Sequence, residues 1–160
     1  MASFPYGYDL WWIDEDRLAG GANPSIETLR TLRENGFATV ISLLDEPGQP
    51  PGYPVAEAVA LGFARHNLPV RDFGAPMPAQ FDLFYHFVGD GLRAGKVLVH
   101  CYAGVGRTGL MAAAYWMRRA RLSAPEAIER VRRARPGAVE ARGQQDALAA
   151  LAERLAAERG

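Results

Sequence analysis

The chain has 160 residues, of which 49% are hydrophobic and 22% charged, so it has enough apolar material for a single domain over residues 1–160. Eighteen Lys and Arg residues balance eighteen Asp and Glu residues, so the overall charge favours neither a nucleic-acid-binding protein nor a membrane-surface protein. The single cysteine, Cys101, excludes an internal disulfide and any site with several cysteine ligands. Cys101 is therefore either an inert buried thiol or a reactive one.

The N-terminal part of the chain predicts short strands, one helix and a buried strand. Residues 10–13 and 17–20 are typical of two strands around an acidic turn. Asn23 is expected to cap a helix with Pro24 in its first position, and this helix is expected to end at Asn35-Gly36. The continuous apolar run 37–44 predicts a strand that is covered on both faces. Six proline and glycine residues then make 47–54 a loop.

The rest of the chain alternates between predicted helices and predicted strands. We expect a helix at 55–61, a strand at 63–68, a loop at 70–78, a helix at 79–93 and a strand at 96–100. An apolar helix at 108–119 follows, then a helix opened by the capping pair Ser123 and Glu126, and a closing helix with Leu148, Leu151 and Leu155 on its buried side. The alternation predicts a single-domain α/β sandwich with a largely parallel central sheet and helices on both faces.

No targeting or membrane segment is expected. Residues 1–9 lack the basic and apolar regions of a signal peptide, and the longest apolar stretches, 37–44 and 109–117, are too short to span a bilayer. We therefore expect a cytoplasmic, reducing setting. We also expect a monomer that has neither a membrane nor a nucleic acid as partner. The seven arginines between Arg118 and Arg135 lack interleaved aromatic residues and are expected to form a solvated face.

The segment that indicates chemistry is Val99-His100-Cys101-Tyr102-Ala103-Gly104-Val105-Gly106-Arg107-Thr108. It places the cysteine at the end of a predicted strand and an arginine just before a predicted helix, with five residues between them. Such a loop can turn successive backbone N–H groups inward and form a nest for a tetrahedral oxyanion. Arg107 can add a bidentate contact to two phosphate oxygens, and the same positive field stabilises a thiolate on Cys101. The Thr108 hydroxyl is placed to donate a hydrogen bond to the sulfur.

This segment resembles the signature of the cysteine-dependent protein tyrosine phosphatases, which is His-Cys, any five residues, Arg, and Ser or Thr. The short chain is most similar to the small atypical dual-specificity phosphatases and their prokaryotic relatives, over a core of roughly 11–151. The resemblance implies Cys101 as nucleophile, Arg107 and the loop residues 102–106 (Tyr102, Ala103, Gly104, Val105 and Gly106) as the phosphate site, and no metal or other cofactor. His100 is expected to orient the loop through hydrogen bonds.

The resemblance also implies a general acid on an upstream loop, because an alkoxide or phenolate leaves poorly unless it is protonated. Asp72, twenty-nine residues before Cys101 and directly after a predicted strand, fits this position. Gln144 is expected to position the water that hydrolyses the phosphocysteine, with its neighbour Gln145 as the alternative. Arg71 and Tyr102 could flank the mouth of the pocket and affect substrate choice.

The expected activity is removal of phosphate from phosphotyrosine, and from phosphoserine and phosphothreonine, in proteins or peptides. The uncharged loop residues Tyr102, Ala103 and Val105 favour a protein substrate over a phosphoinositide or an RNA 5′-phosphate. Two other classes stay open. A rhodanese-type sulfurtransferase also uses one cysteine in an amide loop, and a phosphatase-like domain without activity could bind phosphopeptides. Retention of Cys101, Arg107 and Asp72 argues against the inactive form.

Overall fold

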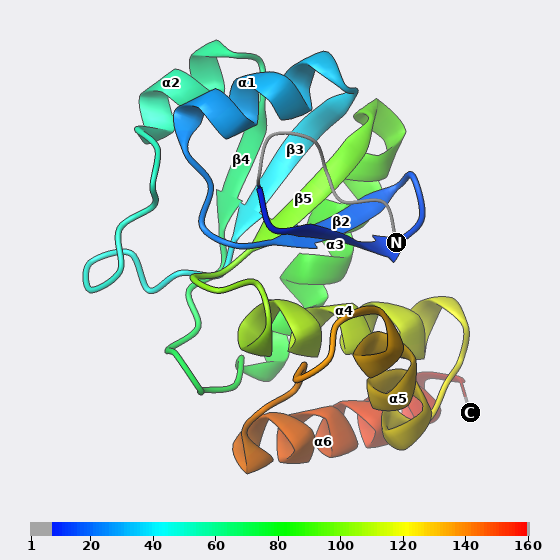
Figure 1. The fold of residues 1–160 in the computed structure, drawn as a ribbon. Helices are drawn as coiled ribbons and strands as arrows, with labels where there is room; N and C mark the ends of the chain where they lie inside the picture. The colour runs from blue at the N-terminus through cyan, green and yellow to red at the C-terminus, as the bar shows by residue number, and fades with distance from the viewer. Residues whose placement is uncertain (1–7, 160) are drawn as a thin grey trace.

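Five strands form one sheet in the computed structural model, which describes residues 8–159 (Figure 1). They lie in the order β1 (Leu10–Asp14), β2 (Leu18–Gly21), β5 (Lys96–His100), β3 (Phe37–Ser42) and β4 (Ala64–Asn67). Only β1 is antiparallel to its neighbour, and the pairs β2–β5, β5–β3 and β3–β4 are parallel. The prediction of a largely parallel sheet is confirmed.

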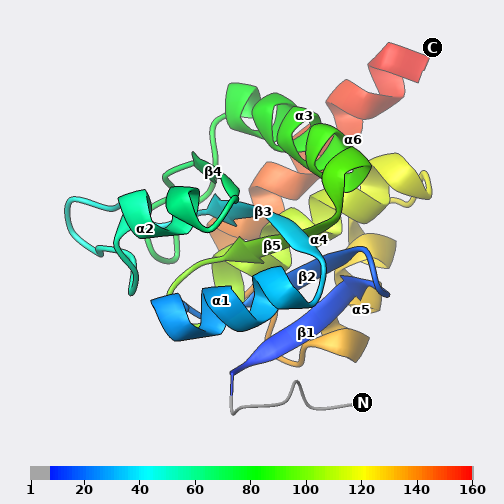
Figure 2. The same ribbon diagram turned by 90° about the horizontal axis from the view of Figure 1, so that it is seen from above.

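Helices cover both faces of this sheet (Figures 1 and 2). One face carries α1 (Ile26–Glu34) and α2 (Val55–Ala60), whose apolar side chains pack on Phe37, Val40 and Leu98. The other face carries α3 (Pro78–Ala94) and α4 (Gly106–Arg119), and α5 (Ala124–Ala134) and α6 (Arg142–Arg159) pack against α4. The chain is therefore a single-domain α/β sandwich, as the sequence predicted.

Helix α4 lies at the centre of the second layer. Every residue from Arg107 to Met117 is buried, because the sheet, α3, α5 and α6 surround this apolar helix. It begins at Gly106, two residues earlier than the sequence predicted, since the Gly109 amide donates to the Val105 carbonyl at 2.8 Å and closes a turn there. The earlier start places both Arg107 and Thr108 in the first turn of the helix.

The cap of α1 was predicted wrongly. Ser25, not Asn23, precedes the helix, and its hydroxyl accepts from the Thr28 amide at 3.2 Å. The Asn23 side chain instead accepts from the Gly52 amide at 2.8 Å and donates to the Pro50 carbonyl at 3.2 Å. Asn23 therefore holds the loop 47–54 over the edge of the sheet where the parallel strands end.

The predicted strands 37–44 and 63–68 are shorter in the structure. Ser42 is the last residue of β3 in register with β4 and β5. Beyond it the Asn67 side-chain amide donates to the Ser42 carbonyl at 3.0 Å and the Leu44 carbonyl at 2.9 Å. Backbone hydrogen bonds continue for a few residues, since the Leu68 amide also donates to the Ser42 carbonyl at 2.8 Å and the Val70 amide to the Leu43 carbonyl at 3.0 Å, and Asn67 adds a side-chain contact where the chain turns toward the loop 47–54.

Within residues 8–159, no helix is long and apolar enough to cross a membrane. The expectation that the N-terminus carries no signal peptide rests on residues 1–9, of which 1–7 lie outside the described part of the chain.

Candidate active site

Cys101 lies between the carboxyl end of β5 and the start of α4, in a segment called here the cysteine loop (residues 101–107). Its sulfur is buried and accepts two hydrogen bonds, from the Thr108 hydroxyl at 3.1 Å and from the Gly104 amide at 3.3 Å. The expected contact between Thr108 and the sulfur is present.

The rest of the protein holds the cysteine loop in shape. The Trp11 indole donates to the Gly104 carbonyl at 2.9 Å, and the Asn23 amide donates to the Tyr102 carbonyl at 2.9 Å. Gly104 has a φ of +77°, and a Cβ at this residue would lie 2.5 Å from the carbonyl carbon of Gly21. Only glycine fits both the conformation and the space. Trp11 and Asn23 thus hold the carbonyls of Gly104 and Tyr102 in place.

Arg107 is buried beside Cys101 and reaches two other loops. Nη1 donates to the Val70 carbonyl at 2.9 Å, and Nη2 donates to Oε1 of Gln49 at 2.9 Å. Nε is buried without a hydrogen-bond partner among the described residues. A guanidinium has five N–H donors, so Arg107 keeps free donors for an oxyanion after its orientation has been set. The sequence did not indicate Gln49, which lies in a loop recognised only by its prolines and glycines.

Asp72 lies at the same place, in the segment called here the acid loop (residues 70–78). Its Oδ1 is 3.5 Å from Nη2 of Arg107, and its side chain is about half exposed, at 51%. The same oxygen accepts from the amide of Phe73, which has a φ of +58° and a side chain on the surface. The fold therefore brings the predicted acid to the mouth of the cysteine loop while leaving it accessible.

Gln144 links the cysteine loop to the acid loop. It is fully buried at the start of α6, and its Nε2 donates to the Gly74 carbonyl at 3.1 Å. A Cβ at Gly106 would lie 3.7 Å from this Nε2 and 2.7 Å from a carboxylate oxygen of Glu140. Gln145 is exposed and lines a separate hollow against α5. Of the two candidates, the structure brings only Gln144 to the site.

His100 is buried beneath the cysteine loop in a chain of hydrogen bonds. Its Nδ1 lies 3.3 Å from the Cys101 carbonyl, which can only accept, so Nδ1 carries the proton. Nε2 then accepts from the Tyr53 hydroxyl at 2.8 Å, and Tyr53 accepts from Nε of Arg65 at 3.2 Å. Burial is the main cause that lowers the pKa of His100 to about 3. His100 is thus a neutral imidazole that contacts the loop backbone.

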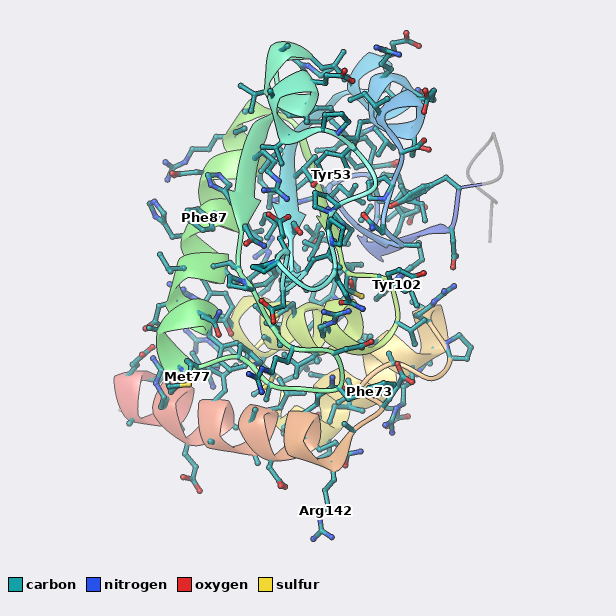
Figure 3. All side chains as sticks on the ribbon, turned by 90° about the vertical axis from the view of Figure 1, so that its left-hand side faces the viewer. Tyr53, Phe73, Met77, Phe87, Tyr102 and Arg142 are labelled. Carbon is teal, nitrogen blue, oxygen red and sulfur yellow. The ribbon has the colours of Figure 1, made fainter. Side chains whose placement is uncertain are left out.

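The side chains at the mouth of the site are exposed. Figure 3 looks onto the face where the loop 47–54, the cysteine loop and the acid loop meet, with Tyr53, Tyr102 and Phe73 labelled. Tyr102 and Phe73 are 61% and 62% exposed, and Ala103 and Arg71 also lie on the surface. Arg71 and Tyr102 are thus exposed next to Asp72 and Cys101, as is Phe73, and their effect on substrate choice stays a prediction.

The basic run is a solvated face, as the sequence predicted, because six of its seven arginines are exposed and only Arg135 is half-buried, but some of them also make contacts. The Arg130 guanidinium lies 3.5 Å from the centre of the Trp116 ring, and Arg132 donates to the carbonyls of Ala138 and Val139 at 2.8 and 2.9 Å. Arg135 forms an ion pair with Asp9. Through these contacts with backbone carbonyls, an aromatic ring and a carboxylate, the arginines stabilise the packing of α5 and the segment after it.

No group of three or more His, Cys, Asp and Glu side chains within residues 8–159 is placed to hold a metal ion. The positive groups near Cys101 are instead Arg107 and the N-terminus of α4.

Comparison with known families gives one consistent result. The family model described as "Dual specificity phosphatase, catalytic domain" matches residues 21–154. Protein tyrosine phosphatase domain-containing protein 1 of Mus musculus is 33% identical over 152 residues, which covers 83% of this chain and 20% of that protein. Dual specificity protein phosphatase 26 of Bos taurus is 32% identical over 128 residues, covering 79% of this chain and 59% of that protein. The chain thus spans about a fifth of the length of the mouse relative.

Solved structures with a similar fold are also known. The structure of Tk-PTP in its active form has a TM-score of 0.85 and 33% sequence identity, and the match covers 95% of this chain and 99% of that one. PTPMT1 in complex with PI(5)P has a TM-score of 0.83 at 24% identity, covering 94% and 99%, which shows likeness of fold.

Proposed function

Because the chain belongs to the dual specificity phosphatase family, we propose that it hydrolyses phosphate monoesters through a phosphocysteine intermediate, with phosphotyrosine, phosphoserine and phosphothreonine in proteins as substrates. The observation that carries this proposal is the arrangement around Cys101. One buried sulfur accepts two hydrogen bonds inside a loop that a buried arginine closes, and a half-exposed carboxylate lies 3.5 Å from that arginine. This arrangement supports the roles of nucleophile for Cys101, of oxyanion site for the loop with Arg107, and of proton donor for Asp72.

In the first step the Cys101 thiolate attacks phosphorus, so that an S–P bond forms while the P–O bond to the leaving group breaks. Asp72, as the carboxylic acid, gives its proton to the leaving oxygen. The free donors of Arg107 and the loop amides bind the three remaining phosphate oxygens as their charge builds up. Gln49 and Val70 position the arginine for this task, because both accept from its terminal nitrogens.

In the second step water attacks phosphorus and the S–P bond breaks, which returns the thiolate. The Asp72 carboxylate takes a proton from that water, and the Gln144 amide orients it. This role for Gln144 is supported by its burial between Gly74 of the acid loop and Gly106 of the cysteine loop. His100 is a positioning residue, since its neutral ring only contacts the Cys101 carbonyl and Tyr53.

A protein substrate is supported by the rim of the site. Tyr102 and Phe73 offer two exposed aromatic faces on which a phosphotyrosine ring can pack. The cysteine loop carries no lysine that would meet the additional phosphates of a phosphoinositide. A reducing, cytoplasmic compartment suits this chemistry, because the chain has no second cysteine with which Cys101 could form a protective internal disulfide.

The first test is hydrolysis of p-nitrophenyl phosphate in excess EDTA, with the thiol kept reduced, by the native protein and by Cys101→Ser. Metal-independent turnover that Cys101→Ser lacks supports the proposal. An inactive native protein across acidic to neutral pH would refute it and favour phosphopeptide binding or sulfur transfer. Thiosulfate turnover is the direct test of the latter.

The second test addresses the acid. Asp72→Ala should slow an alkyl phosphate, whose leaving group needs a proton, more than p-nitrophenyl phosphate, whose leaving group does not. Equal losses for both substrates would remove Asp72 from the mechanism. Arg71→Ala and Tyr102→Ala should alter the preference among phosphopeptides, and unchanged selectivity in both would place the specificity elsewhere.

A further inference from the structure

The acid loop has little packing to hold it in place. Of its nine residues only Val70 and Pro76 are buried, and most of the others are exposed, as Phe73 is on the face shown in Figure 3. A segment with few buried apolar contacts opens easily unless hydrogen bonds hold it. Asp72 can meet a leaving group only while the loop keeps its carboxylate beside Arg107, so the bonds that hold the loop bear on the reaction.

Two of the side chains that hold the acid loop belong to the site described above. Arg107 donates to the Val70 carbonyl at 2.9 Å, near the start of the loop. Gln144 donates to the Gly74 carbonyl at 3.1 Å, near its middle. Within the loop, the Gly74 amide donates to the Arg71 carbonyl at 2.7 Å and closes a tight turn. These bonds do not reach the other end of the loop, where α3 begins.

Gln80, in the first turn of α3, connects the two ends of the acid loop. Its Nε2 donates to the Pro69 carbonyl, just before the loop, at 2.8 Å. Its Oε1 accepts from the Met77 amide, near the end of the loop, also at 2.8 Å. A backbone carbonyl can only accept and a backbone N–H can only donate, so these partners determine the orientation of the Gln80 side-chain amide. One side chain thus joins the two stems between which Asp72 lies.

The bond to Met77 by itself is an ordinary helix cap. A glutamine in the third position of a helix commonly accepts from the backbone amide of the capping residue, and Gln80 does so for α3. The bond to Pro69, called here the Gln80 bridge, has no such role, because Pro69 lies eleven residues before Gln80 and outside the helix. A connection between the ends of a loop removes conformations in which its middle moves away.

We propose that Gln80 is a positioning residue for the proton transfer, because the Gln80 bridge keeps the stems of the acid loop where Asp72 meets Arg107. This inference rests on the proposed function, in which Asp72 gives its proton to the leaving oxygen. Gln80 acts through Asp72 and carries no proton itself. Without the bridge the Asp72 carboxylate spends less time 3.5 Å from Arg107, and esters whose leaving group needs a proton react more slowly.

Two substitutions separate the Gln80 bridge from the helix cap. Gln80→Ala removes both hydrogen bonds. Gln80→Glu keeps an acceptor for the Met77 amide, but an ionised carboxylate has no proton for the Pro69 carbonyl, so only the bridge is lost. The matched control is Glu126→Ala, because Glu126 has the same position in α5, where it accepts from the Ser123 amide at 3.0 Å. Urea unfolding checks that each variant is folded.

Turnover is compared for phenyl phosphate, whose phenolate needs a proton, and p-nitrophenyl phosphate, whose leaving group does not. In Gln80→Ala and Gln80→Glu, kcat/KM for phenyl phosphate should fall about fivefold to tenfold more than that for p-nitrophenyl phosphate, as expected for one lost hydrogen bond. Glu126→Ala should keep the native ratio. Added to Asp72→Ala, Gln80→Ala should cause no further loss with phenyl phosphate, because the group that Gln80 positions is then absent.

Motion of the acid loop can be measured without turnover. The Phe73 amide donates to Oδ1 of Asp72 at 3.1 Å, and the Gly74 amide donates to Arg71, so both N–H groups report the turn that carries the acid. Their NMR relaxation should show more motion in both Gln80 variants than in the native protein and in Glu126→Ala.

Three results in an active protein would overturn the inference: equal losses for both substrates in Gln80→Ala, a native ratio in Gln80→Glu, and unchanged relaxation of the Phe73 and Gly74 amides in both variants. A native protein that turns over neither substrate would refute the proposed function, and this inference with it. The two failures are therefore distinguishable.

Discussion

Acidification should destabilise the protein through one buried imidazole. Burial lowers the pKa of His100 to about 3, whereas an unfolded histidine has a value of about 6.5. Between these two values the unfolded chain binds one proton that the folded protein does not, so the free energy of unfolding falls as the pH falls. The slope is about 1.4 kcal/mol per pH unit, which gives a loss of about 2 kcal/mol between about pH 6.5 and about pH 5.

The assay is urea unfolding, followed by tryptophan fluorescence, at about pH 8 and about pH 5. His100→Gln keeps a polar group beside Tyr53 but cannot titrate, so its loss on acidification should be smaller than that of the native protein by about 2 kcal/mol. The control is His86→Gln, since His86 is exposed beside Asp90 and its replacement should leave most of the native loss in place.

Equal losses in the native protein and His100→Gln would refute this reasoning. A second measurement does not depend on the variant. In the native protein the ring signals of His100 should stay in the neutral form at about pH 5. A midpoint for His100 near the unfolded value of about 6.5 would show that the imidazole is not held neutral by burial.

Three further changes test the scaffold of the site. Tyr53→Phe leaves Nε2 of the buried His100 without a donor, so urea unfolding should show a loss of about 1–3 kcal/mol, and an unchanged midpoint would contradict the hydrogen-bond chain. Gly104→Ala places a Cβ 2.5 Å from the Gly21 backbone and should abolish most phosphatase turnover, whereas Gly89→Ala in α3, where nothing lies within 4 Å, should keep it and gain about 0.5–1 kcal/mol. Full activity in Gly104→Ala would mean that the loop does not need its left-handed residue. Phe84→Ala empties a fully buried position between α3 and the sheet and should cost about 3–5 kcal/mol in the same unfolding assay, and a loss below about 1 kcal/mol would show that this core is loosely packed.

The boundaries that the sequence predicted less well are those decided by side chains from elsewhere in the chain. Asn23 has the composition of a helix cap, yet it binds the backbone at Pro50 and Gly52, and Ser25 caps the helix instead. The strand 37–44 was expected to continue to its last apolar residue, but the regular ladder ends at Ser42, where the Asn67 side chain bonds the carbonyls of Ser42 and Leu44. Neither contact can be predicted from local residue preferences, because each joins residues more than twenty positions apart.

The nucleophile and its loop could be read from the sequence because the chemistry is local. Cys101, Arg107 and Thr108 lie within eight residues between one strand and one helix, so the hydrogen bond from Thr108 to the sulfur could be predicted from the sequence, whereas the one from the Gly104 amide was seen only in the structure. The apolar periodicity likewise determined the layers of the sandwich, since it states which face of each element must be buried.

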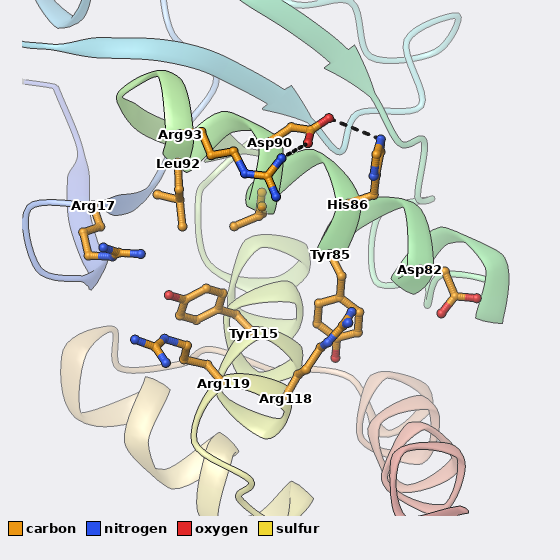
Figure 4. A pocket seen from close by; sticks show the side chains of 12 residues that line it. Arg17, Asp82, Tyr85, His86, Asp90, Leu92, Arg93, Tyr115, Arg118 and Arg119 are labelled. Atoms are coloured by element: carbon orange, nitrogen blue, oxygen red, sulfur yellow. Dashed lines mark hydrogen bonds and ion pairs between the residues drawn. The ribbon is translucent and has the colours of Figure 1, made fainter. Parts of the chain in front are cut away.

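Only the tertiary structure decided the partners that this loop recruits. Gln49 and Val70 orient Arg107, Tyr53 donates to Nε2 of His100, and Gln144 rather than Gln145 contacts the acid loop. The hollow lined by Arg17, Tyr85, Tyr115 and Arg119, too, exists only because α3, α4 and the β1–β2 turn meet (Figure 4). Each of these contacts joins segments that are separate along the chain, and their distance in space is set by how the helices and the sheet pack, which a linear pattern of residue types does not specify.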